Sequence, residues 1–113
     1  MAEWPFSSHH DELRASIRSF VEAELAPHAE EWEAAGDFPD EVFSRMGELG
    51  LLGLPYPEEY GGGGADYLCN IVLAEEMTRC GSGGVAMAVA VQTDMAVPPL
   101  FKFGTEDQKQ RYL

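Results

Sequence analysis

The segment from Ser82 to Thr93 reads SGGVAMAVAVQT and carries no charged side chain. Its composition predicts a helix that is apolar on every side, and such a helix has to be buried on every side. A chain of 113 residues forms at most one domain, whose core has little room for a fully enclosed helix. We therefore expect this helix to lie against protein that these residues do not include.

The rest of the chain also has helical patterns, because apolar residues recur at spacings of three and four. No stretch alternates as a strand does. We predict an all-α fold, an up-and-down or orthogonal bundle of about five to six helices. The first predicted helix runs from about Ser8 to Gly36, with a kink or restart at Pro27. The next two run from Pro39 to Gly50 and from Asp66 to Gly81. The last three run from Ser82 to the double proline Pro98–Pro99, from there to Gly104, and from Thr105 onward.

The predicted helix starts and buried stripes can be assigned to particular residues. Ser8 with Asp11, and Thr105 with Gln108, have the spacing of capping boxes. The segment LLGLPYP, from Leu51 to Pro57, is too short and too rich in proline for a helix, so we expect an apolar plug under the bundle. The side chains expected to face the core are Trp32 of the first helix, Val42, Phe43, Met46 and Leu49 of the second, and Leu68, Cys69, Ile71 and Val72 of the third.

Charge excludes several classes of partner. The net charge is −13, from 20 acidic and 7 basic residues, and such a surface repels nucleic-acid phosphates and anionic lipids. No apolar run approaches the ~20 residues of a membrane span. The start of the chain lacks the basic and apolar regions of a secretory signal. We expect a cytoplasmic protein that binds neither nucleic acid nor membranes.

Two cysteines, Cys69 and Cys80, are present. If both lie on one helix, their Cα atoms are about 16 Å apart at a rise of about 1.5 Å per residue. A disulfide needs Cα atoms within about 7 Å, so we expect two reduced thiols in the core.

The run PEEYGGGGAD places four glycines, Gly61 to Gly64, between two helical patterns. A phosphate-binding loop needs a preceding strand and a lysine, and neither is present. Asp66, the predicted cap of the next helix, would also repel a phosphate. The run instead predicts a tight connection that takes positive φ values and lets two helices approach closely.

Two groups of residues could suggest a metal site. His9, His10 and Asp11 are consecutive, as are Glu30 and Glu31. Adjacent residues point to different sides of a helix, so these groups do not converge on one ion. A solvated helix start and a polar helix face explain them better, and we predict no metal site.

Two other groups could suggest catalysis. Glu75 and Glu76 resemble an acid–base couple, but adjacent helical carboxylates diverge, and a polar face or an ion pair with Arg79 fits them better. Thr93 and Asp94 lack a histidine or cysteine partner close in the sequence. We predict no catalytic residue in this chain.

One arrangement remains. Met87, Val91 and Met95 follow one another at intervals of four residues, with Gln92 beside Val91. This is a flexible apolar stripe edged by one amide. It fits ordinary core packing, and it also fits the wall of a pocket for a long, thin apolar ligand, to which methionine side chains adapt well.

Three stretches resemble the N-terminal helical domain of the acyl-CoA dehydrogenases. They are FPDEVFSRMGELGLLGLPYPEEYGGGGADYL, LAEEMTRCGSG and PLFKFGTEDQKQRYL. The resemblance implies that residues 8–113 form this domain and that residues 1–7 are an N-terminal extension. It also implies a middle β domain and a C-terminal α domain that are absent here, and the chain stops inside a predicted helix, as a cut sequence would.

The resemblance further implies an enzyme that removes hydrogens from the α and β carbons of acyl-CoA thioesters with FAD, and passes electrons to an electron-transferring flavoprotein. Family members are homo-oligomers, tetramers or dimers. The catalytic glutamate and the FAD-binding segments match nothing in these residues, so we expect this chain alone to be inactive and to bind no FAD. By position, the wall of the family's acyl pocket maps to Met87, Val91, Gln92 and Met95.

Two alternatives stay open. One is a stand-alone helical interaction module without catalysis, and the other is a piece of a related acyl-CoA oxidase or flavin monooxygenase. In addition, Pro98 and Pro99 stand where the family more often has one proline or glycine, which predicts an earlier end of the pocket helix.

Overall fold

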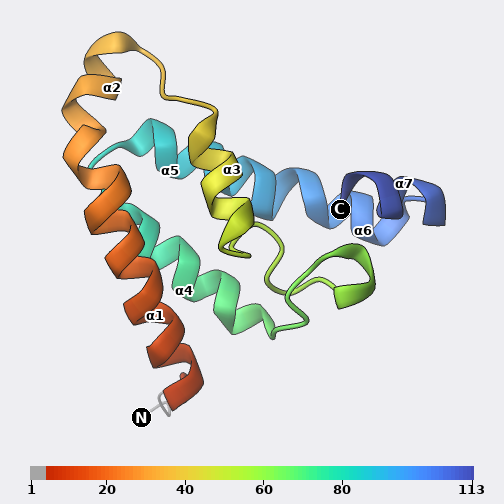
Figure 1. Cartoon of the computed structure of the whole chain (residues 1–113). Coiled ribbons are helices and arrows are strands. Elements are labelled where there is room, and N and C mark those ends of the chain that lie inside the picture. The colour runs from red at the N-terminus through yellow and green to blue at the C-terminus, as the bar shows by residue number, and fades with distance from the viewer. Residues whose placement is uncertain (1–4) are drawn as a thin grey trace.

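The computed structural model describes residues 5–113, and they form five continuous helical rods without a strand (Figure 1). The prediction of an all-α bundle of five to six helices is therefore confirmed. The first rod comprises α1 (Ser8–Phe20), a π-helical turn (Val21–Leu25), a 3₁₀ turn (Ala26–His28) and α2 (Ala29–Ala35). The second rod is α3 (Glu41–Glu48), and the third is α4 (Tyr67–Met77) with a 3₁₀ turn (Thr78–Cys80). The fourth comprises α5 (Gly83–Ala90), the π-helical turn η5 (Val91–Ala96) and α6 (Val97–Phe103), and the fifth is α7 (Glu106–Tyr112).

The helices α1 and α4 lie side by side and run in the same direction, while the rod from α5 to α6 crosses the molecule and carries α7 at its end (Figure 1). The core lies where these rods meet. Its fully buried side chains include Ile17 and Val21 from the first rod, Met46 from α3, and Val72 and Val85 from α4 and α5. Leu51 and Leu54 are also buried, so the predicted apolar plug is confirmed.

Several helix ends were predicted correctly. Gly36, Gly50 and Gly81 follow helical segments with φ values of 74°, 74° and 78°, which glycine adopts without steric cost. Thr105 and Gln108 form the predicted capping box of α7. The cap of α1 was predicted wrongly, because Ser7 rather than Ser8 precedes the helix and His10 takes the place expected for Asp11. The Ser7 backbone N–H donates to His10 Nδ1 over 2.9 Å.

Pro27 neither ends nor restarts the first rod. A proline ring clashes with the carbonyl four residues earlier and has no N–H to donate. The chain responds by widening the preceding turn, in which the Ala26 N–H donates to the Val21 carbonyl, five residues back. The helix therefore passes Pro27 through a π turn and a 3₁₀ turn and continues as α2.

The glycine run lies against the plug rather than between two helices. Gly63, Gly64 and Ala65 donate their N–H groups to the carbonyls of Gly53, Tyr56 and Leu54 over 2.8 to 2.9 Å. At Gly62 this close approach leaves no space for a Cβ, which would overlap the Tyr56 carbonyl. The tight connection and the positive φ values, at Gly61 and Gly64, were predicted correctly, but the predicted partner was wrong.

The predicted buried stripes were partly wrong. Val42 and Met46 of α3, and Cys69 and Val72 of α4, are buried as expected. Leu49 is 43% exposed, because α3 ends at Glu48 and Leu49 turns away from the core. Ile71 is 36% exposed, since α4 turns the face of Val72 and Leu73 inward instead. Both cysteines are buried and free.

Candidate functional site

The rod from Gly83 to Phe103 buries one narrow edge. Val85, Val89, Thr93 and Val97 are each at most 5% exposed and follow one another at intervals of four. In an α-helix of about 3.6 residues per turn, each such step overshoots a full turn by about 40°, so the edge would drift round the helix. The regular interval shows that the rod is underwound around its centre.

The π-helical turn η5 explains the underwinding. In it the Val97 N–H donates to the Gln92 carbonyl, five residues back. The prolines Pro98 and Pro99 follow directly, and neither can donate to the carbonyl that an α-helix would offer it. As at Pro27, the chain avoids the proline rings by widening the turn before them. The expected end of the preceding helix at this double proline is therefore wrong, whereas the helix predicted from the prolines to Gly104 is confirmed as α6.

The opposite side of this rod carries the stripe of Met87, Val91 and Met95, which we call the apolar row. These residues are 57%, 44% and 55% exposed, so residues 5–113 leave about half of each uncovered. The expectation that these residues alone would not enclose this helix is confirmed. Large apolar side chains gathered on one surface indicate a site that another protein part or a ligand covers.

Gln92 lies apart from the apolar row. It lines a cavity of about 320 Å³ together with Tyr56, Tyr60, Tyr112 and the glycines 61–63. Tyr60 at its rim donates its hydroxyl to the Glu106 carboxylate over 2.8 Å, which raises the pKa of Tyr60 to about 12. Of the four predicted pocket residues, the structure places three in one row and the fourth beside the glycine run.

A second hollow, of about 310 Å³, lies beside Met87, the first residue of the row. It lies between α4 and α5 and is lined by apolar side chains, among them Leu73, Met77 and Met87. Asp94 is the one charged residue at its edge among the described residues. Of the apolar row, Met87 therefore lines a groove that is mostly apolar.

The length of this rod is relevant to the prediction that no apolar run is long enough to span a membrane. Gly83–Phe103 is 21 residues long and apolar enough to cross a bilayer by length and composition. The sequence did not show this length, because the double proline was expected to end the helix. A helix at the interface between protein domains passes the same test, so the feature by itself is weak evidence for a membrane.

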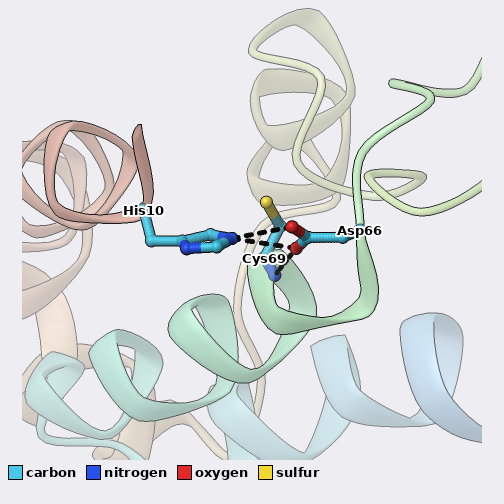
Figure 2. A group of neighbouring side chains, drawn as sticks. All are labelled: His10, Asp66 and Cys69. Carbon is cyan, nitrogen blue, oxygen red and sulfur yellow. Dashed lines mark hydrogen bonds and ion pairs between the residues drawn. The ribbon is translucent and has the colours of Figure 1, made fainter. Parts of the chain in front are cut away.

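His10, Asp66 and Cys69 form a cluster that the sequence did not predict (Figure 2). His10 Nε2 lies 2.9 Å from both carboxylate oxygens of Asp66, whose Oδ1 also accepts from the Cys69 N–H at the start of α4. This contact with His10 lowers the pKa of Asp66. It could not be seen in the sequence because 56 positions separate the two residues.

The ligand atoms of these three residues lie within 4.8 Å of one another, which raises the question of a metal. His10 Nδ1 accepts from the Ser7 N–H, so the neutral ring carries its proton on Nε2 and donates it to Asp66. An Nε2 that carries a proton has no lone pair for a metal ion. The arrangement is better suited to fastening the start of α1 to the start of α4 than to holding a cation.

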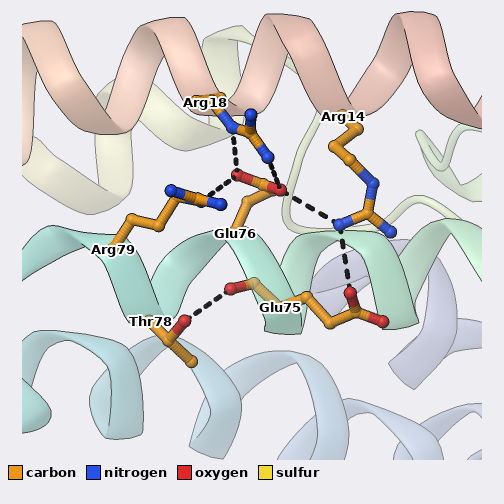
Figure 3. A network of polar contacts seen from close by, with 6 residues as sticks. All are labelled: Arg14, Arg18, Glu75, Glu76, Thr78 and Arg79. Carbon is orange, nitrogen blue, oxygen red and sulfur yellow. Dashed lines mark hydrogen bonds and ion pairs between the residues drawn. The ribbon is translucent and has the colours of Figure 1, made fainter.

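Glu75 and Glu76 do not form an acid–base couple (Figure 3). Glu76 is 1% exposed, accepts hydrogen bonds from Arg14 and Arg18 over 2.9 to 3.0 Å, and forms an ion pair with Arg79 at 3.0 Å. Glu75 is exposed and reaches only Arg14. The predicted pair with Arg79 is confirmed, whereas the two arginines of α1 were not predicted as its partners.

The arginines lower the pKa of Glu76 to about 2, with Arg18 the main cause. A lowered pKa stabilises the fold above the ordinary value near 4.5, and this contribution is lost as the pH falls toward 2. The shift corresponds to about 3 kcal/mol. We expect the free energy of unfolding to fall steeply between about pH 4.5 and pH 2, and this part of the fall to disappear in Glu76→Gln. Urea titrations over that pH range measure both.

The remaining residues considered as catalytic or metal-binding candidates lie in ordinary structural positions. Thr93 is buried and donates its hydroxyl to the Val89 carbonyl over 3.1 Å. His9, Asp11, Glu30 and Glu31 are exposed. The geometry therefore defines an all-helical domain that exposes an apolar row, with a groove beside Met87.

The comparisons with known proteins identify this domain. The model of the acyl-CoA dehydrogenase N-terminal domain matches residues 7–113. The chain is 46% identical over 102 residues to the probable acyl-CoA dehydrogenase YngJ of Bacillus subtilis (strain 168), a match that covers 89% of this chain and 26% of that protein. The chain belongs to the acyl-CoA dehydrogenase family and corresponds to its N-terminal domain.

Solved structures agree. The acyl-CoA dehydrogenase from Geobacillus kaustophilus superposes with a TM-score of 0.90 at 34% identity, over 98% of this chain and 29% of that one. An acyl-CoA dehydrogenase from Bacillus anthracis, complexed with FAD, gives a TM-score of 0.85 at 33% identity, over 96% of this chain and 18% of that one. The chain thus spans about a quarter of the length of the relatives that it matches.

Proposed function

We propose that this domain supplies one wall of the acyl pocket in an enzyme that oxidises acyl-CoA thioesters at the α and β carbons. The observation that carries the proposal is the apolar row, whose three large side chains are about half exposed and whose first member, Met87, lines an apolar groove. Relatives that this chain matches are acyl-CoA dehydrogenases. Within the wall, Met87, Val91 and Met95 would contact the acyl chain, and Gln92 would lie at its margin.

FAD would accept the hydride from the β carbon in such an enzyme. The residues of this chain do not fit the FAD pyrophosphate, because the N–H groups of Gly62, Gly63 and Gly64 already donate to backbone carbonyls. We therefore propose that other parts of the protein hold the cofactor and the catalytic base, and that this chain alone turns over no substrate. An electron-transferring flavoprotein as acceptor, a homo-oligomeric assembly and a cytoplasmic location belong to the same proposal.

A carboxylate in the apolar row tests the proposal. In Val91→Asp a charge would have to be desolvated beside the acyl chain, which costs several kcal/mol. In the whole, FAD-loaded protein we expect kcat/KM for octanoyl-CoA to fall at least about a hundredfold, since about 1.4 kcal/mol corresponds to tenfold. Stopped-flow reduction of the flavin by octanoyl-CoA measures it.

Leu49→Asp is the matched control. Leu49 is 43% exposed and Val91 is 44% exposed, so both substitutions place a carboxylate at a half-exposed apolar position. Leu49 lies just past the end of α3, outside the apolar row, and its variant should keep the activity. An equal loss in both variants would speak against a pocket wall at Val91. If the unaltered protein leaves its flavin oxidised with every acyl-CoA, the alternative of a non-catalytic interaction module gains support.

A further inference from the structure

The apolar row keeps an interval of four along a helix whose centre is the π turn η5. Met87 and Met95 are eight positions apart, and in an α-helix of about 3.6 residues per turn they would differ by about 80° around the axis. Here Met87, Val91 and Met95 have similar exposures, on the side opposite the buried edge of Val85, Val89, Thr93 and Val97. Both the row and the buried edge keep the interval of four.

The cause of the wide turn is the pair of prolines that follows the apolar row. The wide turn η5 includes Val91 and Met95, and the prolines Pro98 and Pro99 begin two residues after its end. In an α-helix their rings would collide with the carbonyls of Asp94 and Met95. The hydrogen bond from the Val97 N–H to the Gln92 carbonyl shows that the chain has taken the wider turn instead.

The first rod provides an independent example of the same effect. There the π turn Val21–Leu25 precedes Pro27 at a similar distance, and the Ala26 N–H reaches back five residues. Both π turns of the described residues thus stand directly before proline. This recurrence supports proline as the cause of each.

We propose that Pro98 and Pro99 set the register of the apolar row, holding Met95 in line with Met87 and Val91 so that one extended, unbranched acyl chain contacts all three. The row then measures about 12 Å, from eight steps of about 1.5 Å along the axis. This inference rests on the proposed function for the ligand, whereas its structural part, the dependence of the π turn on the prolines, stands without it. π turns within α-helices are often found at functional sites.

The test replaces both prolines by alanine in the whole, FAD-loaded protein. Alanine restores the missing N–H groups and favours the α-helix, so the variant should fold at least as well as the parent. A crystal structure of the variant should show a regular α-helix in which Met95 has turned away from Met87. Retention of the π turn would overturn the proposal that the prolines cause it.

Ligand binding tests the second half of the proposal. We expect the Kd of lauroyl-CoA, measured by calorimetry, to rise about tenfold in the double proline variant, as for the loss of one apolar contact in a pocket. Met95→Ala should produce a similar rise in the parent and no further rise in the proline variant, because Met95 has already left the row there. Additive effects, or an unchanged Kd in a variant with a regular α-helix, would overturn the register role.

Pro27→Ala is the control, since it removes a proline that follows a π turn far from the apolar row. It should convert the π turn Val21–Leu25 into regular α-helix without changing the Kd of lauroyl-CoA. If the unaltered protein binds no acyl-CoA at all, the proposed function fails and the ligand part of this inference fails with it. The crystal structure of the double proline variant then still decides whether the prolines impose the π turn.

Discussion

Replacing Glu76 by glutamine is expected to lower the free energy of unfolding by about 3 kcal/mol. The carboxylate of Glu76 is 1% exposed and is the shared acceptor of Arg14, Arg18 and Arg79. Removing one partner of a buried ion pair typically costs about 3 to 5 kcal/mol. We expect the lower end because the side chains of Arg18 and Arg79 are 41% and 50% exposed, and they can recover hydration.

Equilibrium unfolding in urea at pH 7 measures the change, and Glu75→Gln is the control on the next residue. The side chain of Glu75 is 51% exposed and pairs only with Arg14, so its loss should cost less than about 1 kcal/mol. Similar costs for the two variants would mean that the burial of Glu76 is not what gives its contacts their strength. The network would then be an ordinary surface cluster.

Replacing Gly62 by alanine is expected to destabilise the fold by a comparable amount, about 3 kcal/mol. A Cβ at this position would overlap the Tyr56 carbonyl oxygen and lie 2.6 Å from its carbonyl carbon. These are backbone atoms, so relief requires the glycine run and the plug to separate. That movement would strain the hydrogen bonds that Gly63 and Gly64 donate to Gly53 and Tyr56.

Thermal unfolding followed by circular dichroism measures this loss, with Gly83→Ala as control. Gly83 is the first residue of α5, and a Cβ there meets no atom within 4 Å. Alanine should therefore stabilise the helix by up to about 1 kcal/mol. A melting temperature for Gly62→Ala as high as that of the parent would show that the two backbone segments can part at little cost.

Local patterns in the sequence were enough to predict the helical rods. Glycine at Gly36, Gly50 and Gly81, and the capping box at Thr105, mark helix ends through local backbone geometry. The double proline was interpreted wrongly because proline disfavours a helix interior without excluding it. Whether the chain stops or widens its turn there depends on packing, here on the buried edge from Val85 to Val97.

The sequence was enough to predict the side chains of the apolar row, but not the residues that border it. Intervals of four identified Met87, Val91 and Met95, whereas the placement of Gln92 depends on where the rod lies relative to the glycine run. The polar contacts of α1 with α4 could not be predicted, since 56 to 62 positions separate their partners. Only the folded chain brings such residues together.

The polar contacts between α1 and α4 have a mechanical consequence. His10 with Asp66 fastens the pair at its beginning, and Arg18 with Glu76 fastens it further along. Two helices pinned at two points can neither slide nor pivot on each other, so they form a stiff base beneath α5. Because α4 also packs against α5, this base supports the helix that carries Met87.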